Sequence, residues 1–390
     1  MKIAVFTDSY YPHVSGVTTT VDKQIQKLAE MGHRIKLFCP KFKKQSRAGQ
    51  DLPKNIDIIR LPANVPFPGY STFSVSIPTV TKSLKEIRKF RPDIIHIHTE
   101  GGVGWEGLIC AKIRKIPIIT TLHTFLAHQE YLKHWKIDKF ESFQKIAWKY
   151  ILMIHNQAKL VICPSLAMKK EAVENGLEVN AKVIANGIDL SEYSKVAKAS
   201  PDKTSENKFH FIYVGRVAVE KSLPVLIKAF KIIAKKQPKT KLTIIGDGPA
   251  LAGLREMVNH QHLAGQVIFT GQIPHNQLMN SDLISSANTF ITPSKTENQP
   301  ISVLEAMAFG LPLIGVDALG MGELIKHKKN GFLAEPDNHR QIAQYGLKLV
   351  NNPQLAGQFG QKSLQMVKQL SLTKTGKELE SVYKKTVQQK

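Results

Sequence analysis

Apolar and polar positions follow a regular alternation along this chain. Short runs of apolar, mostly β-branched residues are each followed by a longer stretch with helical periodicity. The runs lie at 3–7, 35–38, 56–61, 94–98, 118–122, 160–164 and 182–184, and again at 209–214, 241–245, 267–270, 289–291, 313–316 and 331–333. This alternation predicts βαβ units on parallel sheets, and therefore an α/β protein.

The chain has 390 residues, which is too long for one ordinary domain and fits two. A polar segment at 191–208, which contains Pro201, interrupts the alternation and indicates a linker. We predict two doubly wound, Rossmann-like domains facing each other across a cleft, at 1–195 and 209–365, with a linker at 196–208. A helix at 366–390 can pack back on the first domain. Ligands of such sheets bind beyond the carboxyl ends of the strands.

The formal charge of +23 favours an anionic partner, which can be nucleic acid, a nucleotide or an anionic membrane surface. The basic residues are dispersed, and no helix-turn-helix, zinc-finger or RNA-binding signature accompanies them. We therefore expect no nucleic-acid partner. A well-solvated basic surface without a specific partner stays open.

The cysteines and the lengths of the apolar stretches indicate the cellular compartment of the protein. Cys39, Cys110 and Cys163 lie far apart in apolar surroundings, which predicts buried, reduced thiols and argues against disulfides or a zinc site. No stretch has the pattern of a signal peptide or of a membrane-spanning helix. We expect a cytoplasmic protein, and a peripheral position on the inner face of the cell membrane stays open.

Two glutamates eight residues apart, Glu297 and Glu305, give the strongest functional signal. Because Pro300 is unfavourable inside a helix, we expect Glu297 on a loop and Glu305 in the second turn of the following helix, so that both face one cleft. The amides from about Asn298 to Ser302 would lie at the helix N-terminus, where free N–H groups suit an anionic or hydroxyl-rich ligand. A capped surface helix is the structural alternative.

The loop after the run at 209–214 carries a second signal. Arg216 and Lys221 stand five residues apart between a predicted strand and a predicted helix. A planar guanidinium and a point charge together suit a pyrophosphate, including one that becomes more negative as it leaves.

Weaker candidates follow other strands. Gly16 would let the backbone approach a phosphate, His123 ends a strand at the edge of the cleft, and the turn that ends at Ile273 could place backbone groups near a planar base. Each has a plain structural alternative as a turn or a packing residue. His96 and His98 either face the cleft or pack beneath it.

Taken in order, these motifs resemble a retaining glycosyltransferase of the GT-B fold, in family 4. The resemblance spans nearly the whole chain. It rests on Ser-Gly-Val at 15–17, His-Thr at 123–124, Asn-Gly-Ile-Asp at 186–189, Gly-Arg with Glu-Lys at 215–221, Gly-Asp-Gly-Pro at 246–249 and Glu-x7-Glu at 297–305.

The resemblance implies a role for each matching residue and for each domain. The first domain would bind the acceptor and the second the nucleotide sugar. Gly16 would touch the phosphates or the sugar, His123 the donor sugar, Arg216 with Lys221 the diphosphate, Glu297 the transferred sugar and Glu305 the ribose. The implied catalytic residues are His123, Glu297, Arg216 and Lys221, and the implied donor-binding residues are Gly16, Arg216, Lys221, Ile273, Glu297, Asn298, Gln299, Pro300, Ile301, Ser302 and Glu305.

The resemblance also bears on metal and sugar. No Asp-x-Asp motif is evident, so no metal and no other cofactor is expected beyond the nucleoside-diphosphate sugar. One departure concerns the donor sugar: many family members carry a Gly-rich loop between the two glutamates, where this chain has Asn298-Gln299-Pro300-Ile301. Pro300 removes one amide donor, so the identity of the sugar does not transfer.

Within the family, the first residues and the stretch 123–165 most resemble enzymes that glycosylate lipids, such as diacylglycerol glucosyltransferases and phosphatidylinositol mannosyltransferases. The segment 131–150 interleaves lysines with Trp135, Phe140, Phe143 and Trp148, which suits anionic lipid headgroups, although an amphipathic helix with core aromatics fits as well. We predict transfer of a hexose from a UDP-glucose or GDP-mannose type donor to a membrane glycerolipid.

Other functions stay open: a glycan or polysaccharide acceptor, a sugar-nucleotide epimerase, or a non-catalytic protein that binds anionic ligands. The oligomeric state is left open.

Overall fold

The structure, a computed structural model, describes residues 1–41, 52–62, 65–66, 74–76, 78–123, 141–193 and 208–389. The chain forms two compact units, each built on its own parallel sheet. Every predicted strand run forms a strand, with its ends shifted by at most two residues. The predicted fold class, two Rossmann-like α/β domains, is confirmed.

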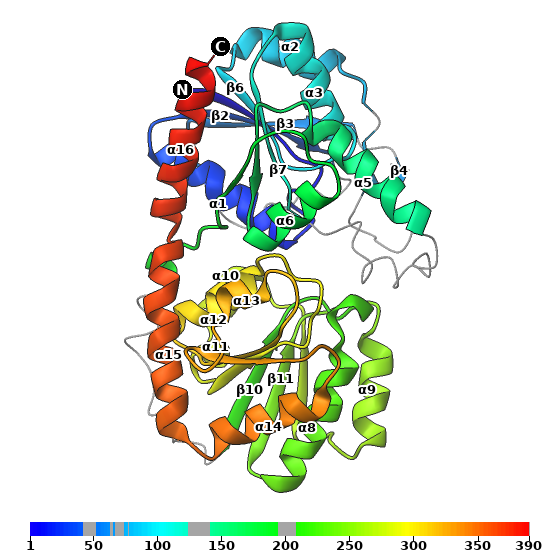
Figure 1. The fold of residues 1–390 in the computed structure, drawn as a ribbon, viewed down its shortest axis with the longest axis vertical. Coiled ribbons are helices and arrows are strands. Elements are labelled where there is room, and N and C mark those ends of the chain that lie inside the picture. Colours follow the sequence, from blue (N-terminus) through cyan, green and yellow to red (C-terminus); the bar gives the residue numbers. More distant parts are fainter. Residues whose placement is uncertain are drawn as a thin grey trace. The chain divides into compact units, whose positions relative to one another are not determined.

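The first unit is built on a seven-stranded parallel sheet of order β3-β2-β1-β6-β7-β8-β9 (Figure 1). Its strands are β1 (Lys2–Phe6), β2 (Arg34–Pro40), β3 (Ile56–Leu61), β6 (Ile94–Ile97), β7 (Ile118–Thr121), β8 (Leu160–Cys163) and β9 (Ala181–Val183). Its helices are α1 (Gly16–Glu30), α2 (Thr81–Phe90), α3 (Gly102–Arg114), α5 (Glu141–His155), α6 (Leu166–Glu174) and α16 (Leu372–Gln388), and β4 (Val65–Pro66) and β5 (Ser74–Val75) form a short antiparallel pair.

The second unit is built on a six-stranded parallel sheet of order β12-β11-β10-β13-β14-β15. The strands are β10 (Phe209–Val214), β11 (Thr240–Ile245), β12 (Val267–Gly271), β13 (Thr289–Ile291), β14 (Leu313–Val316) and β15 (Gly331–Ala334). The helices are α8 (Leu223–Lys236), α9 (Leu251–His260), α10 (His275–Met279), α11 (Asp282–Ser285), α12 (Ile301–Ala308), α13 (Met321–Leu324), α14 (His339–Val350) and α15 (Pro353–Val367), with 3-10 turns η1 (Val219–Lys221) and η2 (Lys368–Leu370).

Both faces of the second sheet are buried, because successive side chains of each strand point to opposite faces and both sets are apolar. Along β10, Phe211 belongs to one buried hydrophobic cluster and its neighbour Ile212 to another. A parallel sheet that buries both faces needs strands that are apolar at nearly every position, which is the pattern of these runs.

The last helix of the chain belongs to the first unit. α16, red in Figure 1, packs against α1. Its Leu379, Val382 and Tyr383 are buried in the same cluster as Ile3 and Val5 of β1.

The division between the units falls at Gly187 and Ile188, earlier than position 195. Ile188 and Tyr193 belong to a core cluster of the second unit, because their apolar side chains are covered there. Residues 194–207, which include most of the predicted linker, lie outside the described part of the chain. All three cysteines are buried and free, as predicted. None of the described helices is long and apolar enough to span a bilayer.

Candidate active site

In the first unit, the loops after β1, β6 and β7 meet at the carboxyl edge of the sheet, because these three strands are neighbours. The connection after β1 leads through α1 to β2 on one side, whereas β6 lies on the other side. The edge beyond β1 and β6 is therefore a topological switch point, the usual ligand position in such sheets.

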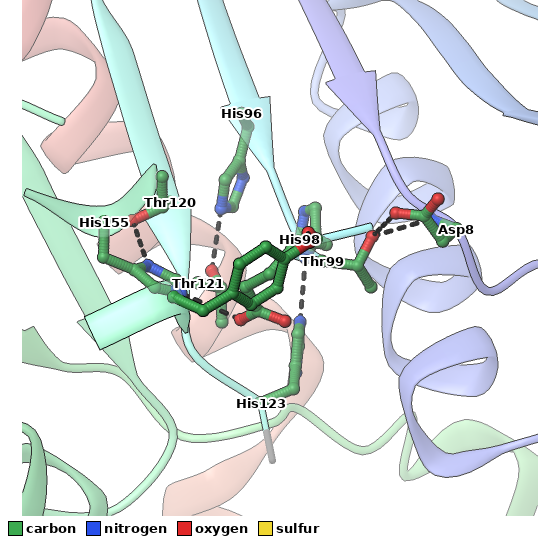
Figure 2. A network of polar contacts seen from close by, with 10 residues as sticks. Asp8, His96, His98, Thr99, Thr120, Thr121, His123 and His155 are labelled. Atoms are coloured by element: carbon green, nitrogen blue, oxygen red, sulfur yellow. Dashed lines mark hydrogen bonds and ion pairs between the residues drawn. The ribbon is translucent and has the colours of Figure 1, made fainter. Parts of the chain in front are cut away.

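Histidines gather at this edge (Figure 2). His98 Nδ1 lies 2.9 Å from His123 Nε2, so one ring donates a hydrogen bond and the other accepts it. His96 Nδ1 lies 2.6 Å from the Tyr383 hydroxyl, and His96 Nε2 lies 2.7 Å from the Thr121 hydroxyl. His96 therefore packs beneath the edge, whereas His98 contacts the predicted site residue His123.

Burial sets the charge of these rings. It lowers the pKa of His96 to about 3, with a smaller contribution from His123. It also lowers the pKa of His123 to about 3, with His155 contributing, and holds the pKa of His98 well below its ordinary value. At neutral pH all three rings are uncharged, so His123 can exchange hydrogen bonds with a sugar hydroxyl but brings no charge to a phosphate.

The loop after β1 is organised by two short-range contacts. Asp8 is buried and accepts hydrogen bonds from the Val103 amide at 2.9 Å and the Thr99 hydroxyl at 2.6 Å, which ties this loop to the N-terminus of α3. Burial is the main cause that raises the pKa of Asp8.

Gly16 is the first residue of α1, because Ser15 caps that helix by accepting from the Thr18 amide at 3.1 Å. A Cβ on Gly16 would meet no described atom within 4 Å. The described part of the first unit thus leaves room for a ligand beside this backbone.

In the second unit, the loops after β10 and β13 meet over the switch point of that sheet, since β10 lies between β11 and β13. They bring together two predicted site residues. Lys221 Nζ, on the loop after β10, lies 2.6 Å from Glu297 Oε1, on the loop after β13, and both side chains are largely buried. Burial by itself would raise the pKa of Glu297, but Lys221, with a smaller effect of Arg216, lowers it overall.

Arg216 has its own carboxylate. Its guanidinium lies 2.5 Å from Glu220 Oε1, and it is more exposed than the buried glutamate. Arg216 and Lys221 are therefore each matched by one glutamate, and the Lys221–Glu297 and Arg216–Glu220 pairs together hold two positive and two negative charges. Sequence reasoning named both cations but gave no role to Glu220, although it stands immediately before Lys221 in the Glu-Lys motif.

Glu305 lies in the second turn of α12, as predicted, but its contacts are different from those of Glu297. His275 Nε2 lies 2.6 Å from Glu305 Oε1, and the Tyr193 hydroxyl donates to the same oxygen at 3.5 Å. Sequence reasoning missed both partners. The position of His275 just after Pro274, at the start of α10, is a signal that could have found it; nothing marked Tyr193.

The start of α12 corrects one expectation. The helix begins at Ile301 with Pro300 as its N-cap, so the amides of Asn298 and Gln299 precede it and only those from Ile301 onward are helical. Asn298 and Gln299 are buried, and Ser302 is half-buried. Pro300 has no N–H, and its ring suits the extended backbone of an N-cap.

Ile273 lies on the loop between β12 and α10 and packs against the cluster that contains Val303 and Leu304 of α12. It therefore packs in the same hydrophobic region as α12, whose Glu305 contacts His275.

The basic, aromatic segment 131–150 is described only from residue 141 onward, so Trp135 and Phe140 lie outside the described residues. Of its remaining aromatics, Trp148 is 1% exposed and belongs to the core, whereas Phe143 is 40% exposed. Of the two interpretations of this segment, Trp148 supports the amphipathic helix with core aromatics, because the inward face of α5 buries it. Among the described residues, no group of three or more His, Cys, Asp or Glu side chains could hold a metal ion.

Comparison with known proteins also divides the chain in two, with the boundary between residues 192 and 196. Residues 14–192 match the family model for Glycosyltransferase Family 4, and residues 196–366 match that for Glycosyl transferases group 1. An alpha-monoglucosyldiacylglycerol synthase of Streptococcus pneumoniae is 30% identical over 85% of this chain and 75% of its own. A GDP-mannose-dependent alpha-mannosyltransferase of Corynebacterium glutamicum is 27% identical over 86% and 77%. The crystal structure of Anabaena HepE in complex with UDP-glucose aligns with a TM-score of 0.77 at 20% identity, over 99% of this chain and 100% of that one.

Two parallel Rossmann-like units, each with polar side chains at its switch point, together with these matches define a GT-B glycosyltransferase. The chain belongs to glycosyltransferase family 4.

Proposed function

We propose that this protein is a retaining, metal-independent glycosyltransferase that moves a hexose from a nucleoside-diphosphate sugar, of the UDP-glucose or GDP-mannose type, to a membrane glycerolipid. The observation that carries the proposal is the Lys221–Glu297 pair over the switch point of the second sheet, with Arg216 near enough to influence the pKa of Glu297.

The chemistry follows from these charges. A diphosphate competes with Glu297 for Lys221 and with Glu220 for Arg216, which releases Glu297 to bind the transferred sugar. As the bond from the sugar to the diphosphate breaks, negative charge grows on the leaving oxygen, and Lys221 and Arg216 stabilise it as a metal would. That oxygen takes the proton of the acceptor hydroxyl, whose oxygen bonds to the same face of the sugar.

Other residues position the donor. His275 and Tyr193 contact Oε1 of Glu305, so the carboxylate is held in one orientation to accept hydrogen bonds from the ribose hydroxyls. The remaining contacts to the phosphate, base or sugar are those that the family resemblance implies. In this proposal they come from the amides at the start of α12, the backbone near Ile273 and Gly16, and the neutral imidazole of His123.

The names of similar proteins support the choice of substrates. One relative is named for a glucosylated diacylglycerol and another for GDP-mannose, and one structural neighbour holds UDP-glucose. A lipid acceptor places the working enzyme peripherally on the inner face of the membrane. A glycan or polysaccharide is the second candidate acceptor, favoured by a relative from Bacillus subtilis named as a putative teichuronic acid biosynthesis glycosyltransferase.

The first test is product formation from labelled UDP-glucose, UDP-galactose or GDP-mannose, each with liposomes that contain diacylglycerol or phosphatidylinositol. Transfer to lipid from one donor, with the anomeric configuration kept and chelator without effect, supports the proposal. Slow donor hydrolysis without lipid product redirects the search to glycans. An altered sugar nucleotide without transfer indicates an epimerase, and no donor turnover contradicts the proposal.

Variants test the residue roles. Lys221→Ala or Glu305→Ala should lower kcat/KM for the donor by about 100-fold while the protein stays folded, because each removes a charged contact to the donor. Lys235→Ala, at the exposed end of α8, is the matched control and should keep wild-type kinetics. Wild-type kinetics in both site variants would remove the site assignment.

A further inference from the structure

Helix α5 is apolar on two opposite faces. Trp148, Ile151 and Leu152 face inward and are buried. The outer side shows a stripe of large apolar residues at spacings of three and four: Phe143, Ile146, Tyr150 and Met153, which are 40%, 63%, 48% and 50% exposed. Such spacing places all four on one helix face. A helix that only covered the core would carry polar residues here.

The stripe lies beside a groove between α3 and α5. The groove has a volume of about 710 Å³, and its walls include Trp105, Ile109, Leu152 and Met153. Ile113 of α3, 55% exposed, also lines it. We call the stripe and the groove lining together the α3–α5 face. Five of the ten large apolar residues that are exposed in the described chain lie on this face.

Positive charge frames these apolar residues. Lys112, Lys145 and Lys149 line the groove and are exposed, and Glu178 is the acidic residue of the lining. Lysines can lay their apolar stems along a surface while the ammonium groups reach outward. Exposed apolar side chains surrounded by lysines are typical of a surface that docks on anionic lipid.

We propose that the α3–α5 face docks on an anionic lipid bilayer. Phe143, Ile146 and Met153 insert among the headgroups and upper acyl chains, and the lysines contact lipid phosphates. The excess of positive charge in the chain draws it to the same surface. A second copy of this chain fits less well, because a symmetric contact would set the lysines of one copy against those of the other.

The same face is tied to the candidate site of the first unit. The Tyr150 hydroxyl donates to the Glu100 carbonyl at 2.8 Å and accepts from Trp105 Nε1 at 3.3 Å. The Glu100 carboxylate lies 2.8 Å from His155 Nε2, within the network of Figure 2. The docking face is thus linked by hydrogen bonds, through Glu100, to His155, which also influences the pKa of His123. The inference rests on the proposed function in that a lipid acceptor must be reached at a membrane.

The test measures binding of the full chain to vesicles of phosphatidylcholine with and without phosphatidylglycerol. Ile146→Asp should lower the partition coefficient at least about fivefold, because a charge replaces an inserted apolar side chain. Lys145→Glu/Lys149→Glu should remove the preference for phosphatidylglycerol and its dependence on salt. The matched controls are Ile268→Asp, an isoleucine 49% exposed in the second unit, and Lys235→Glu/Lys236→Glu at the end of α8.

Several outcomes would overturn the inference. These are no binding of the wild type to anionic vesicles, equal loss in the variants and their controls, or a wild-type dimer that Ile146→Asp converts to monomer. Transfer to dioctanoylglycerol in detergent separates this result from the proposed function. If the protein binds vesicles but transfers sugar to no acceptor, the docking face stands and the lipid glycosyltransferase is rejected. If it transfers sugar in detergent but does not bind vesicles, the glycosyltransferase stands and the docking face is rejected.

Discussion

Among individual side chains, burial has opposite consequences for the two candidate sites. The histidines at the edge of the first sheet lose their charge, because burial disfavours the protonated ring and neighbouring histidines add to that effect. Glu297 is also buried, but Lys221 at 2.6 Å outweighs the desolvation and keeps the carboxylate ionised. The first unit thus offers neutral hydrogen-bonding groups, and the second offers charges.

The low pKa of His96 predicts that the first unit loses stability in mild acid. Below pH 6.5 the unfolded chain takes up a proton at this histidine, whereas the folded chain, with a pKa of about 3, does not. Stability is therefore full above pH 6.5 and falls as the pH drops toward 3, and His96 alone should cost about 1.4 kcal/mol between pH 7.5 and 5.5.

Denaturant unfolding followed by tryptophan fluorescence measures this loss, since Trp105 and Trp148 lie in the first unit. His96→Gln should be less stable at pH 7.5 but show a flatter pH dependence, whereas His260→Gln, on an exposed position of α9, should follow the wild type. An equal slope in all three proteins would contradict the assignment of a neutral, buried His96.

Among elements, the strand-end loops of the second unit pack backbone against backbone. A Cβ on Gly246, which has a φ of 140°, would lie 1.9 Å from the carbonyl oxygen of Gly215. A Cβ on Gly320 would lie 1.7 Å from the carbonyl oxygen of Asn298. These glycines let neighbouring loops approach closely enough to hold Arg216 and Glu297 in place.

Gly246→Ala should therefore impair donor use although residue 246 contributes no side chain to the site. The added methyl displaces the loop that carries Arg216, so we expect kcat/KM for the donor to fall at least about tenfold, with a loss of stability of about 2 kcal/mol. Gly253→Ala in α9, where a Cβ meets no described atom within 4 Å, should raise stability by about 0.5 kcal/mol and keep activity. Donor kinetics and thermal unfolding of the two variants test this prediction. Equal changes in Gly246→Ala and Gly253→Ala would count against loop packing as the cause.

At the scale of the whole molecule, helix α16 returns to the first unit after the chain has formed the second. α16 packs against α1, and its Tyr383 bonds to His96 across 287 residues of sequence. The first unit is completed only when the chain has passed through the second, so its stability depends on the last residues.

Tyr383→Phe should lower the stability of the first unit by about 2 kcal/mol, because His96 Nδ1 loses its partner in a buried position. Leu379→Ala should cost about 3 kcal/mol through the cavity it leaves in the same cluster. Tryptophan fluorescence during denaturant unfolding measures both effects. Unfolding midpoints like that of the wild type would show that α16 contributes little to the first unit.

The sequence by itself determined the strands and the α/β class, and it predicted the residues of the candidate site. The strand runs were readable because buried parallel strands are apolar at nearly every position. Arg216, Lys221 and Glu297 were predicted because strand-end loops in such folds carry ligands, and Glu305 was predicted because its spacing from Glu297 matched a known family.

Tertiary structure decided what depends on contacts between distant segments. Only the sheet order brings Lys221 to Glu297, 76 residues on, and only the folded second unit brings His275 of α10 to Glu305 of α12. The burial of Trp148 and the hydrogen bond between His98 and His123 likewise depend on tertiary packing, which the residues next to each of them in the sequence do not fix. The periodicity of apolar residues along the sequence predicts the helices and strands. The charge states of buried groups and the pairing of distant side chains arise only when those helices and strands pack together and exclude water.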